Sequence, residues 1–457
     1  MKLKEFGGIT MNRIDKFKNG NESSDLDVHF YLMVFLIITV LAVLSFAGTS
    51  DSNSSSAAAV PDYACTRLTG DWCGERTKLA EKGIKFDIDM VQSYQGVLDG
   101  GLRHQWKYGG SMDYRMKLDF EKMGLWPGGF VDIFAETQFG EFINRDTGAI
   151  IPANTDGVLP YPERHVTTLT QVLYTQFFSQ TFGLFFGKIC TFSGDWNYFA
   201  SGWGNDQFMN LNLVINPVTF RTVPYSALGG GAIFLFPQLS PNPKQPSMLT
   251  VNFLGPNGES GQWPWDDFSS GTASAVEFKQ PTKFFGKQGS QLVGATYSSK
   301  DFAVLDQDHR LILDFLLGFP VTPRKNDGSW SFYYNFYQFL YEEEKDPSQG
   351  FGVFGRFGTA DDETNPIENF YSIGLGGKGI FDGRDKDTFG VGYYYSVLSD
   401  KVPDLLHLFG DSQGFEVYYN IEVNPWLHIA PDFQIINPSN ERIDTTYVAG
   451  FRVRIDF

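Results

Sequence analysis

The chain has 457 residues and a formal net charge of -17 at pH 7, from 53 acidic and 36 basic residues. An acidic chain repels a polyanion, which argues against nucleic acid as a partner. The 44 Phe, 21 Tyr and 49 Gly favour strands and turns over helices, and the sequence contains neither CxxC nor HExxH, so it predicts no metal and no cofactor.

The N-terminus has the three parts of an export leader. Basic residues precede an uncharged apolar run over 30–47, and the small residues of GTSDSNSSSAAAV follow it. This order predicts a secretory signal peptide over residues 1–59, cleaved near Ala47 or within 57–59. The alternative is an uncleaved anchor, because about 18 apolar residues can just span a membrane. No comparable run follows residue 60, so a mature chain that crosses a membrane would have to cross it with strands.

Residues 60–84 are predicted to form an N-terminal periplasmic segment with one short helix. The stretch RTKLAEKG has helix-forming residues and a glycine that ends the helix. Cys65 and Cys73 are close enough in sequence to form a disulfide in an oxidising compartment, although two free thiols fit the same spacing.

Residues 85–457 alternate between apolar and polar side chains, as in strands. GSMDYRMKLDF places Met112, Tyr114 and Met116 on one face and charged residues on the other. GLWPGG then supplies a turn, and FVDIFAETQF returns as the second strand of a hairpin. The pattern recurs in GFEVYYNIEV and LHIAPDFQII, and the chain ends on one more alternating strand, TYVAGFRVRIDF.

Strands of about nine to eleven residues with one apolar and one charged face are typical of a transmembrane β-barrel. Backbone groups left unpaired in lipid are costly, so the last strand has to pair with the first. The chain length suits about 14 to 18 such strands. The predicted fold is therefore all-β: a closed antiparallel transmembrane barrel of about 16 strands, wide enough for an aqueous channel.

The segment FFGKICTFSGDWNYFASGWGNDQF is the sharpest candidate for a constriction. A strand ends at Lys188, and a tryptophan-rich loop follows with Asp195, Trp196 and Trp203. A loop that folds into the barrel would narrow the channel, and we expect Lys188 with either tryptophan to line the eyelet. The alternative is an external loop packed on the rim.

Several blocks together resemble the OprB-type carbohydrate-selective porins of the bacterial outer membrane. The family's N-terminal signature is similar to LTGDWCGERTKLAEKGI, and its later blocks are similar to GLWPGG, NPIENFYSIGLGGKGIFDGRDKDTFGVGYYYS, FEVYYNIEVNPWLHIAPDFQIINP and FRVRIDF. The resemblance covers residues 66–457, and Lys188 matches a basic position after a strand glycine. It departs from the family at Cys73, where the family has glycine, and it is loose over 215–330.

The resemblance implies a sixteen-stranded outer-membrane barrel through which sugars, glucose among them, diffuse. A sugar offers hydroxyls and flat C–H faces, so charged and aromatic side chains in the lumen would select it. Small carbohydrates and outer-membrane lipid are the expected partners of a monomer or homotrimer. The channel-lining candidates are Asp113, Arg115, Lys117, Asp119, Asp132, Glu136, Lys188, Asp195, Trp196, Trp203, Arg356, Glu416, Glu422, Arg452 and Arg454.

The alternative function is a secreted all-β carbohydrate-binding protein or glycosidase. A glycosidase needs a placed pair of carboxylates, and no pair stands out among the many acidic residues. The stretch GLGGKG at 374–379 lacks the Ser or Thr that follows the lysine of a phosphate-binding loop, so we reject nucleotide binding. We therefore expect a passive sugar channel and not an enzyme.

Overall fold

The computed structural model describes most of the chain beyond the predicted leader. The described residues are 62–162, 165–263, 265, 267–308, 320, 322–402 and 409–457. The signal peptide predicted at 1–59 lies outside them and stays a prediction. Within the described residues, no helix combines the length and the apolar character needed to cross a membrane.

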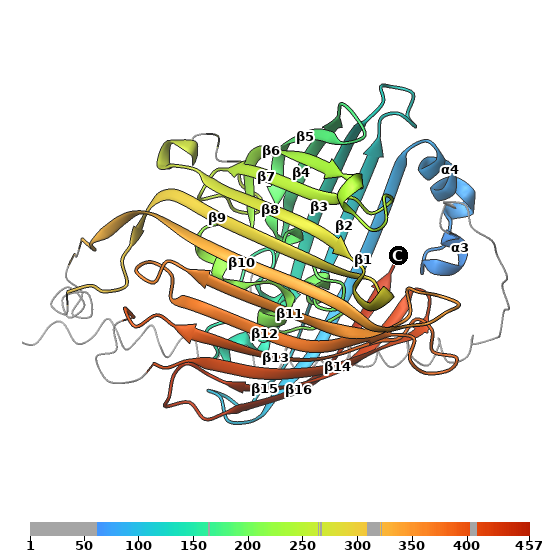
Figure 1. The fold of residues 1–457 in the computed structure, drawn as a ribbon. Coiled ribbons are helices and arrows are strands. Elements are labelled where there is room, and N and C mark those ends of the chain that lie inside the picture. Colours follow the sequence, from blue (N-terminus) through green and yellow to red (C-terminus); the bar gives the residue numbers. More distant parts are fainter. Residues whose placement is uncertain are drawn as a thin grey trace, which may run out of the picture. The chain divides into compact units, whose positions relative to one another are not determined.

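Sixteen antiparallel strands form one closed barrel in the described part of the chain (Figure 1). Neighbours in the sequence are neighbours in the sheet, and β1 (Ile84–Asp99) pairs with β16 (Thr446–Asp456) to close the ring. The prediction of fold class and strand number is therefore confirmed. The other strands are β2 (Trp106–Asp119), β3 (Gly129–Gly140), β4 (Val166–Phe177), β5 (Phe182–Cys190), β6 (Ser226–Phe236), β7 (Ser247–Leu254), β8 (Ala273–Thr282), β9 (Gly289–Ala303), β10 (Lys325–Glu342), β11 (Gly350–Ala360), β12 (Ile367–Lys378), β13 (Thr388–Leu398), β14 (Ser412–Asn424) and β15 (Leu427–Asn437).

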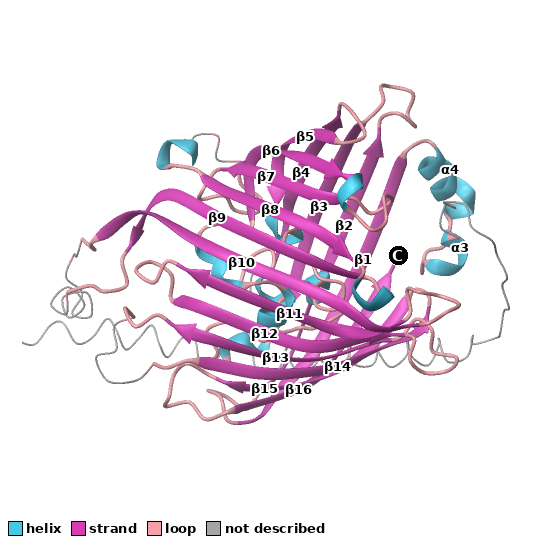
Figure 2. Ribbon diagram, viewed as in Figure 1, coloured by secondary structure: helices cyan, strands magenta, loops and turns pink. Residues whose placement is uncertain are grey.

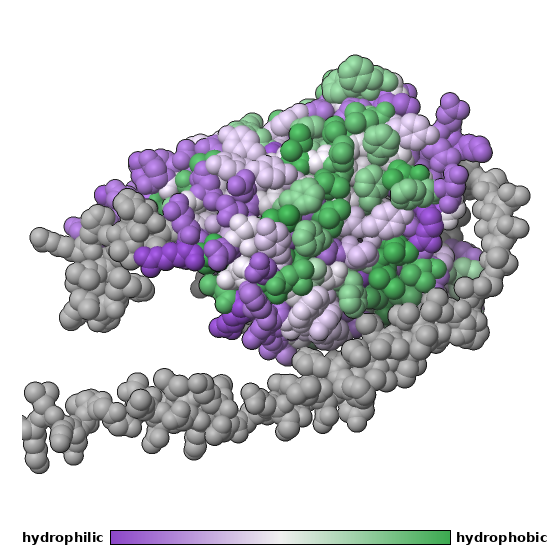
Figure 3. Space-filling model, turned by 90° about the horizontal axis from the view of Figure 1, so that it is seen from below, coloured by the Kyte–Doolittle hydropathy of each residue, from purple (hydrophilic) through white to green (hydrophobic). Residues whose placement is uncertain are grey.

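The two faces of the strands differ as the alternation predicts. On β12, Tyr371, Ile373 and Leu375 are exposed on the outside of the barrel, whereas Ser372 between them is buried on the inside. Apolar residues cover much of the middle of the barrel face seen in Figure 3, and hydrophilic residues gather toward the two ends. Such an apolar band between polar rims is what a strand barrel presents to lipid.

The connections differ between the two ends of the barrel. At one end, which we call the terminal end, the C-terminus lies near α3 and α4 (Figure 1) and the strands are joined by turns, such as that between β14 and β15. At the opposite end, which we call the loop end, the connections include the longer segments 141–165, 191–225 and 255–272. These loops supply the chain that can enter the lumen.

The segment before β1 holds a short helix, as expected. It contains α3 (Tyr63–Thr66), a 3-10 turn and α4 (Glu75–Glu81). Gly83 has φ of +86° and ends the helical turn, a conformation that favours glycine. Cys65 and Cys73 are both exposed free thiols, so the structure does not contain the disulfide that their spacing suggested.

Arg76 of α4 holds the end of the chain against the first strand. Its guanidinium donates to the backbone oxygens of Phe457 and Phe86, each at 2.7 Å. The same group lies over the rings of Tyr63 and Trp72, 4.6 Å and 5.0 Å from their centroids. A chain end of this kind frays unless something secures it, and here the buried arginine does so at the seam between β1 and β16.

Candidate functional site: the barrel lumen

Residues 191–225, between β5 and β6, fold into the barrel, and we call them the inner loop. Figure 2 shows short helical turns behind the strands, within the ring. The side chains of Asn210 and Asn216 cap two of these turns by accepting backbone N–H groups. The turns are Thr191–Ser193, Gly202–Gly204, α5 (Leu211–Val214) and Pro217–Arg221.

Arg356 of β11 is the main tether of the inner loop. Its Nε donates to Asp195 Oδ2 at 2.7 Å, and both side chains are almost fully buried. Its other nitrogens donate to loop carbonyls, among them those of Ala200 at 2.5 Å and Leu213 at 3.0 Å. The guanidinium therefore satisfies backbone acceptors that no water can reach.

Two further wall charges hold the same loop. Glu416 of β14 accepts the backbone N–H groups of Met209 and Asn210 at 2.5 Å and 2.9 Å. Arg452 of β16 donates to the carbonyl of Gly204. All three wall residues are 3% exposed or less. The prediction that Arg356, Glu416 and Arg452 line the open channel is therefore wrong: they point inward, but the loop covers them.

An apolar cluster fixes the loop against one side of the wall. Phe199, Phe208 and Leu213 of the loop pack with buried residues of β10 to β14, including Tyr394. Glycines in the wall make room for them, since a Cβ on Gly390 would lie 2.6 Å from Phe208 Cζ. This packing occupies the lumen next to these strands.

Arg115 and Lys117 of β2 keep part of their side chains accessible. The guanidinium of Arg115 lies over the rings of Phe134 and Trp203, 4.2 Å and 4.8 Å from their centroids. Its side chain keeps 32% of its surface exposed. Lys117 is more exposed, and its Nζ lies 3.8 Å from Asp132 Oδ2. These side chains can therefore meet a solute.

Arg454 of β16 completes a group of paired charges. Its guanidinium lies 3.5 Å from Asp206 of the inner loop, 3.9 Å from Asp89 of β1 and 3.0 Å from Asp456. The arginine side chain is 26% exposed and that of Asp206 is 44% exposed. The pair joins the loop to the wall at the barrel seam and still meets water.

Lys188 differs from its predicted role. It is fully buried, and its Nζ donates to the carbonyls of Glu259 and Gln262 at 2.6 Å and 2.5 Å. These carbonyls belong to the β7–β8 loop, whose Gly261 also donates to Leu169 of β4. This backbone hydrogen bond joins the loop to β4 at a position beyond the last residue of β5, Cys190. The expectation that Lys188 lines the eyelet is wrong, because its ammonium anchors this loop.

Of the other predicted loop residues, Asp195 holds the loop to the wall, whereas the two tryptophans stay partly accessible. Asp195 is buried with Arg356, whereas Trp196 is 43% exposed. Lys279 of β8 places its Nζ 4.0 Å from the centroid of the Trp196 ring. Trp203 is half-buried beside Arg115. Both tryptophans therefore keep accessible surface in the lumen, as Asp206 of the same loop does.

The remaining predicted residues are spread along the barrel. Glu136 is buried and accepts from the Tyr225 hydroxyl at 2.8 Å. Asp113 is also buried, 3.7 Å from Arg115. Asp119 accepts a backbone N–H of the β2–β3 turn, and Glu422 lies beside the β14–β15 turn opposite His428, so these last two belong to the terminal end.

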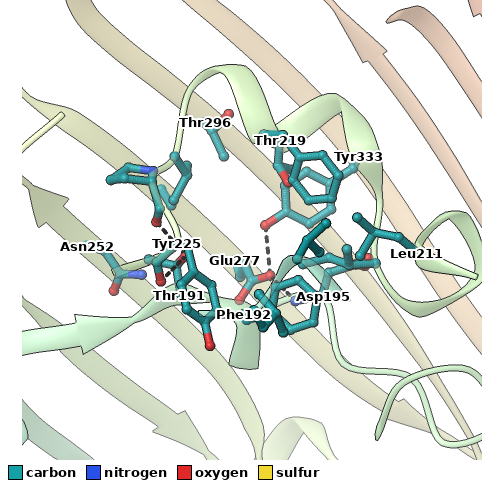
Figure 4. A pocket seen from close by; sticks show the side chains of 18 residues that line it. Thr191, Phe192, Asp195, Leu211, Thr219, Tyr225, Asn252, Glu277, Thr296 and Tyr333 are labelled. Carbon is teal, nitrogen blue, oxygen red and sulfur yellow. Dashed lines mark hydrogen bonds between the residues drawn. The ribbon is translucent and has the colours of Figure 1, made fainter. Parts of the chain in front are cut away.

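A recess of about 280 Å³ lies between the inner loop and the wall strands β7 to β10 (Figure 4). Its polar lining includes Asn252, Glu277 and Tyr333. Asn252 and Glu277 were not predicted as lining residues because they lie in 215–330, where the chain resembles the family only loosely. The alternation in SAVEFKQ was the available signal, since it sets Glu277 and Lys279 on the face opposite Val276 and Phe278.

Comparisons with known proteins agree on one family. The model of the carbohydrate-selective porin family OprB matches residues 103–457. Porin B of Pseudomonas aeruginosa is 24% identical over 85% of this chain and 91% of its own length. The putative porin QuiX of Acinetobacter baylyi is 23% identical over 85% and 93%. The high-pH structure of Pseudomonas putida OprB superposes with a TM-score of 0.73, at 20% identity, over 87% of this chain and 100% of that one.

The closed strand barrel with its apolar outside and polar lumen defines a porin of the bacterial outer membrane. Porins are channels rather than enzymes, which removes the glycosidase alternative. The chain belongs to the OprB family of carbohydrate-selective porins, and carbohydrates diffuse through it across the outer membrane.

Proposed function

We propose that the channel favours single sugar units of the size of glucose and that they pass along the open wall formed by β16, β1, β2 and β3. The observation that carries this proposal is the stacking of Arg115 on Phe134 and Trp203. Stacking occupies the faces of the guanidinium but leaves its N–H groups in the plane, where they can donate to hydroxyls. The tryptophan offers an apolar face for C–H groups.

The balance of charge supports a neutral solute. Lys117 faces Asp132, and Arg454 faces Asp206 and Asp89. Lys117 and Arg454 therefore each have an anion nearby, which weakens the field that a permeating ion would feel beside them. Charged groups still form stronger hydrogen bonds to hydroxyls than neutral groups do. Such a wall can hold a sugar without preferring one sign of ion.

Liposome swelling tests the proposal. Vesicles that contain the protein should swell faster in glucose than in a disaccharide by more than their difference in free diffusion. Arg115→Met should reduce glucose entry severalfold, because it removes five donors from the open wall. Arg103→Met is the matched control, since this exposed arginine lies in the β1–β2 loop. Equal entry through wild type and Arg115→Met would exclude Arg115 from the path.

We also propose that the loop end faces the cell exterior and that residues 60–84 lie in the periplasm. Outer-membrane barrels carry short turns on the periplasmic side and longer loops outside, and both features occur here at opposite ends. The predicted leader should be absent from the mature protein. Mass measurement of the protein purified from outer membranes tests this, and an intact mass would show an uncleaved anchor.

A further inference from the structure

The recess between the inner loop and β7 to β10 has no part in the path described above. We propose that it is a binding site for one monosaccharide, with Glu277 as its principal acceptor. The inference rests on the proposed function, because it assumes that sugars enter this lumen. It adds a saturable site to a channel that would otherwise only filter by diffusion.

The recess is built from the wall and both ends of the inner loop. Asn252, Ala275 and Thr296 lie opposite one another on β7, β8 and β9 and form its wall. The small side chain of Ala275 leaves the space in front of it open. The volume of about 280 Å³ is many times the roughly 10 to 15 Å³ that one water molecule needs, so the recess has room for a solute such as one pyranose ring. The recess is not enclosed, so a solute can enter.

Glu277 presents an unsatisfied acceptor to this space. Its two hydrogen bonds, from Asp195 N at 2.8 Å and the Tyr333 hydroxyl at 2.7 Å, both fall on Oε1. Figure 4 shows the carboxylate among the residues that line the recess. Within the described residues, no cation lies within ion-pair distance of it, and Lys279 two positions along is placed over Trp196 instead. Oε2 therefore keeps its capacity to accept from a sugar hydroxyl.

Asn252 adds a second polar group. Its Oδ1 is buried and makes no hydrogen bond within the described part of the chain. A buried polar atom without a partner is costly, and rotation of the amide toward a bound hydroxyl would relieve that cost. The carboxylate and the amide come from different strands, so they can engage different hydroxyls of one ring.

The inner loop supplies much of the apolar lining of the recess, through residues such as Phe192, Ile215 and Val223. Polar side chains of the same loop, Thr219 and Tyr225 among them, also line it. A pyranose has hydroxyls around its edge and C–H groups on its faces, so a recess with both polar groups and aromatic and aliphatic surfaces matches it better than it matches an ion. This mixed lining is the reason to assign a sugar rather than a cation to Glu277.

Glu277→Gln tests the assignment with little disturbance. The amide oxygen can still accept from Asp195 N and Tyr333, while the amide nitrogen replaces the free acceptor with a donor. In planar bilayers, added glucose should block the ion current of the wild type in a saturable way. The half-blocking concentration should rise about tenfold or more in Glu277→Gln, as expected for loss of a charged hydrogen bond.

Two further variants separate the effect of the recess from the effect of charge. Ala275→Leu should fill the recess and raise the half-blocking concentration without changing any charge. Glu344→Gln removes the same charge from an exposed turn at the terminal end and should leave it unchanged. A half-blocking concentration in Glu277→Gln within twofold of the wild type would overturn the inference, as would a wild-type current that glucose blocks without saturation.

The outcomes separate the two proposals. If the wild type admits glucose in liposome swelling but Glu277→Gln behaves like the wild type in bilayers, the recess is not a binding site and the channel function stands. If Glu277→Gln changes only the ion conductance, Glu277 acts on ions and the inference fails. If the wild type admits no glucose in either assay, the proposed function itself fails.

Discussion

Charged side chains inside this barrel either bind the inner loop or remain accessible to a solute, and the burial of each side chain distinguishes the two roles. Arg356, Glu416 and Arg452 form hydrogen bonds to backbone groups of the inner loop, because buried peptide groups need partners. Arg115 and Arg454 have carboxylates nearby but remain partly exposed. Only the second kind is available to a solute, so inward direction alone does not identify a channel-lining residue.

Asp156 should make the stability of the folded protein depend on pH. This residue of the β3–β4 loop is 3% exposed, and burial raises its pKa from 3.8 to about 7. The folded state then binds the proton more tightly than the unfolded state, so stability falls as pH rises from 3.8 to about 7 and levels off above that. Asp156→Asn should therefore raise the unfolding temperature in detergent at about pH 8 and hardly at all at about pH 4. An equal gain at both pH values would contradict this account.

The inner loop takes its shape from the wall rather than from its own sequence. Its helical segments are short, and α5 spans only Leu211–Val214. Isolated helices of that length do not persist in water. Instead, the loop is held by the Arg356–Asp195 pair, by Glu416 and by the aromatic cluster against β10 to β14. The position of the constriction therefore depends on tethers in strands that are distant in sequence.

Arg356→Met tests the strongest tether. It leaves the buried carboxylate of Asp195 without its partner, which costs about 3 to 5 kcal/mol for a pair of this kind. We expect a lower unfolding temperature and a noisier, larger single-channel conductance, since the loop would leave the wall part of the time.

The double variant Arg356→Met, Asp195→Asn separates charge from packing. Removing both charges should recover part of the lost stability, because the unpaired buried charge is gone. The measurement is a double-mutant cycle on unfolding free energy. Strictly additive effects of the two substitutions would show that the pair does not act as a tether.

For the whole molecule, stability depends on the seam where β1 meets β16. The pairing runs from Asp89 opposite Asp456 to Asp99 opposite Tyr447, and the N-terminal segment covers its terminal end through Arg76. A barrel has no edge strand once this seam is paired. The segment before the barrel thus stabilises the pairing of β1 with β16.

Arg76→Gln should weaken the contact between the N-terminal segment and the seam of β1 and β16. It removes a buried guanidinium that donates to both strands at the seam, with an expected loss of about 3 kcal/mol. The temperature at which the folded band converts to the unfolded band on a gel should fall. Lys78→Gln on the same helix is the control, because its pair with Glu75 is solvent-exposed and worth little. Equal conversion temperatures for both variants would remove Arg76 from the seam.

The amino-acid pattern is enough to predict the barrel and its family. Alternation in segments such as GSMDYRMKLDF sets the two faces of each strand, and a strand in lipid has no alternative to pairing, so closure into a ring follows from local pattern. Chain length limits the ring to about 14 to 18 strands. The choice between a loop on the rim and a loop in the lumen did not follow from local pattern, because both place Trp196 and Trp203 near water.

Which polar residues form the site depends on contacts between distant segments of the chain. Lys188 of β5 anchors the β7–β8 loop because its ammonium donates to two carbonyls there, and Glu277 is a candidate because Asp195 and Tyr333 both bond to one of its oxygens. These contacts join residues more than fifty positions apart. Local periodicity tells which way a side chain points, but what it meets there depends on how the closed ring brings distant segments together.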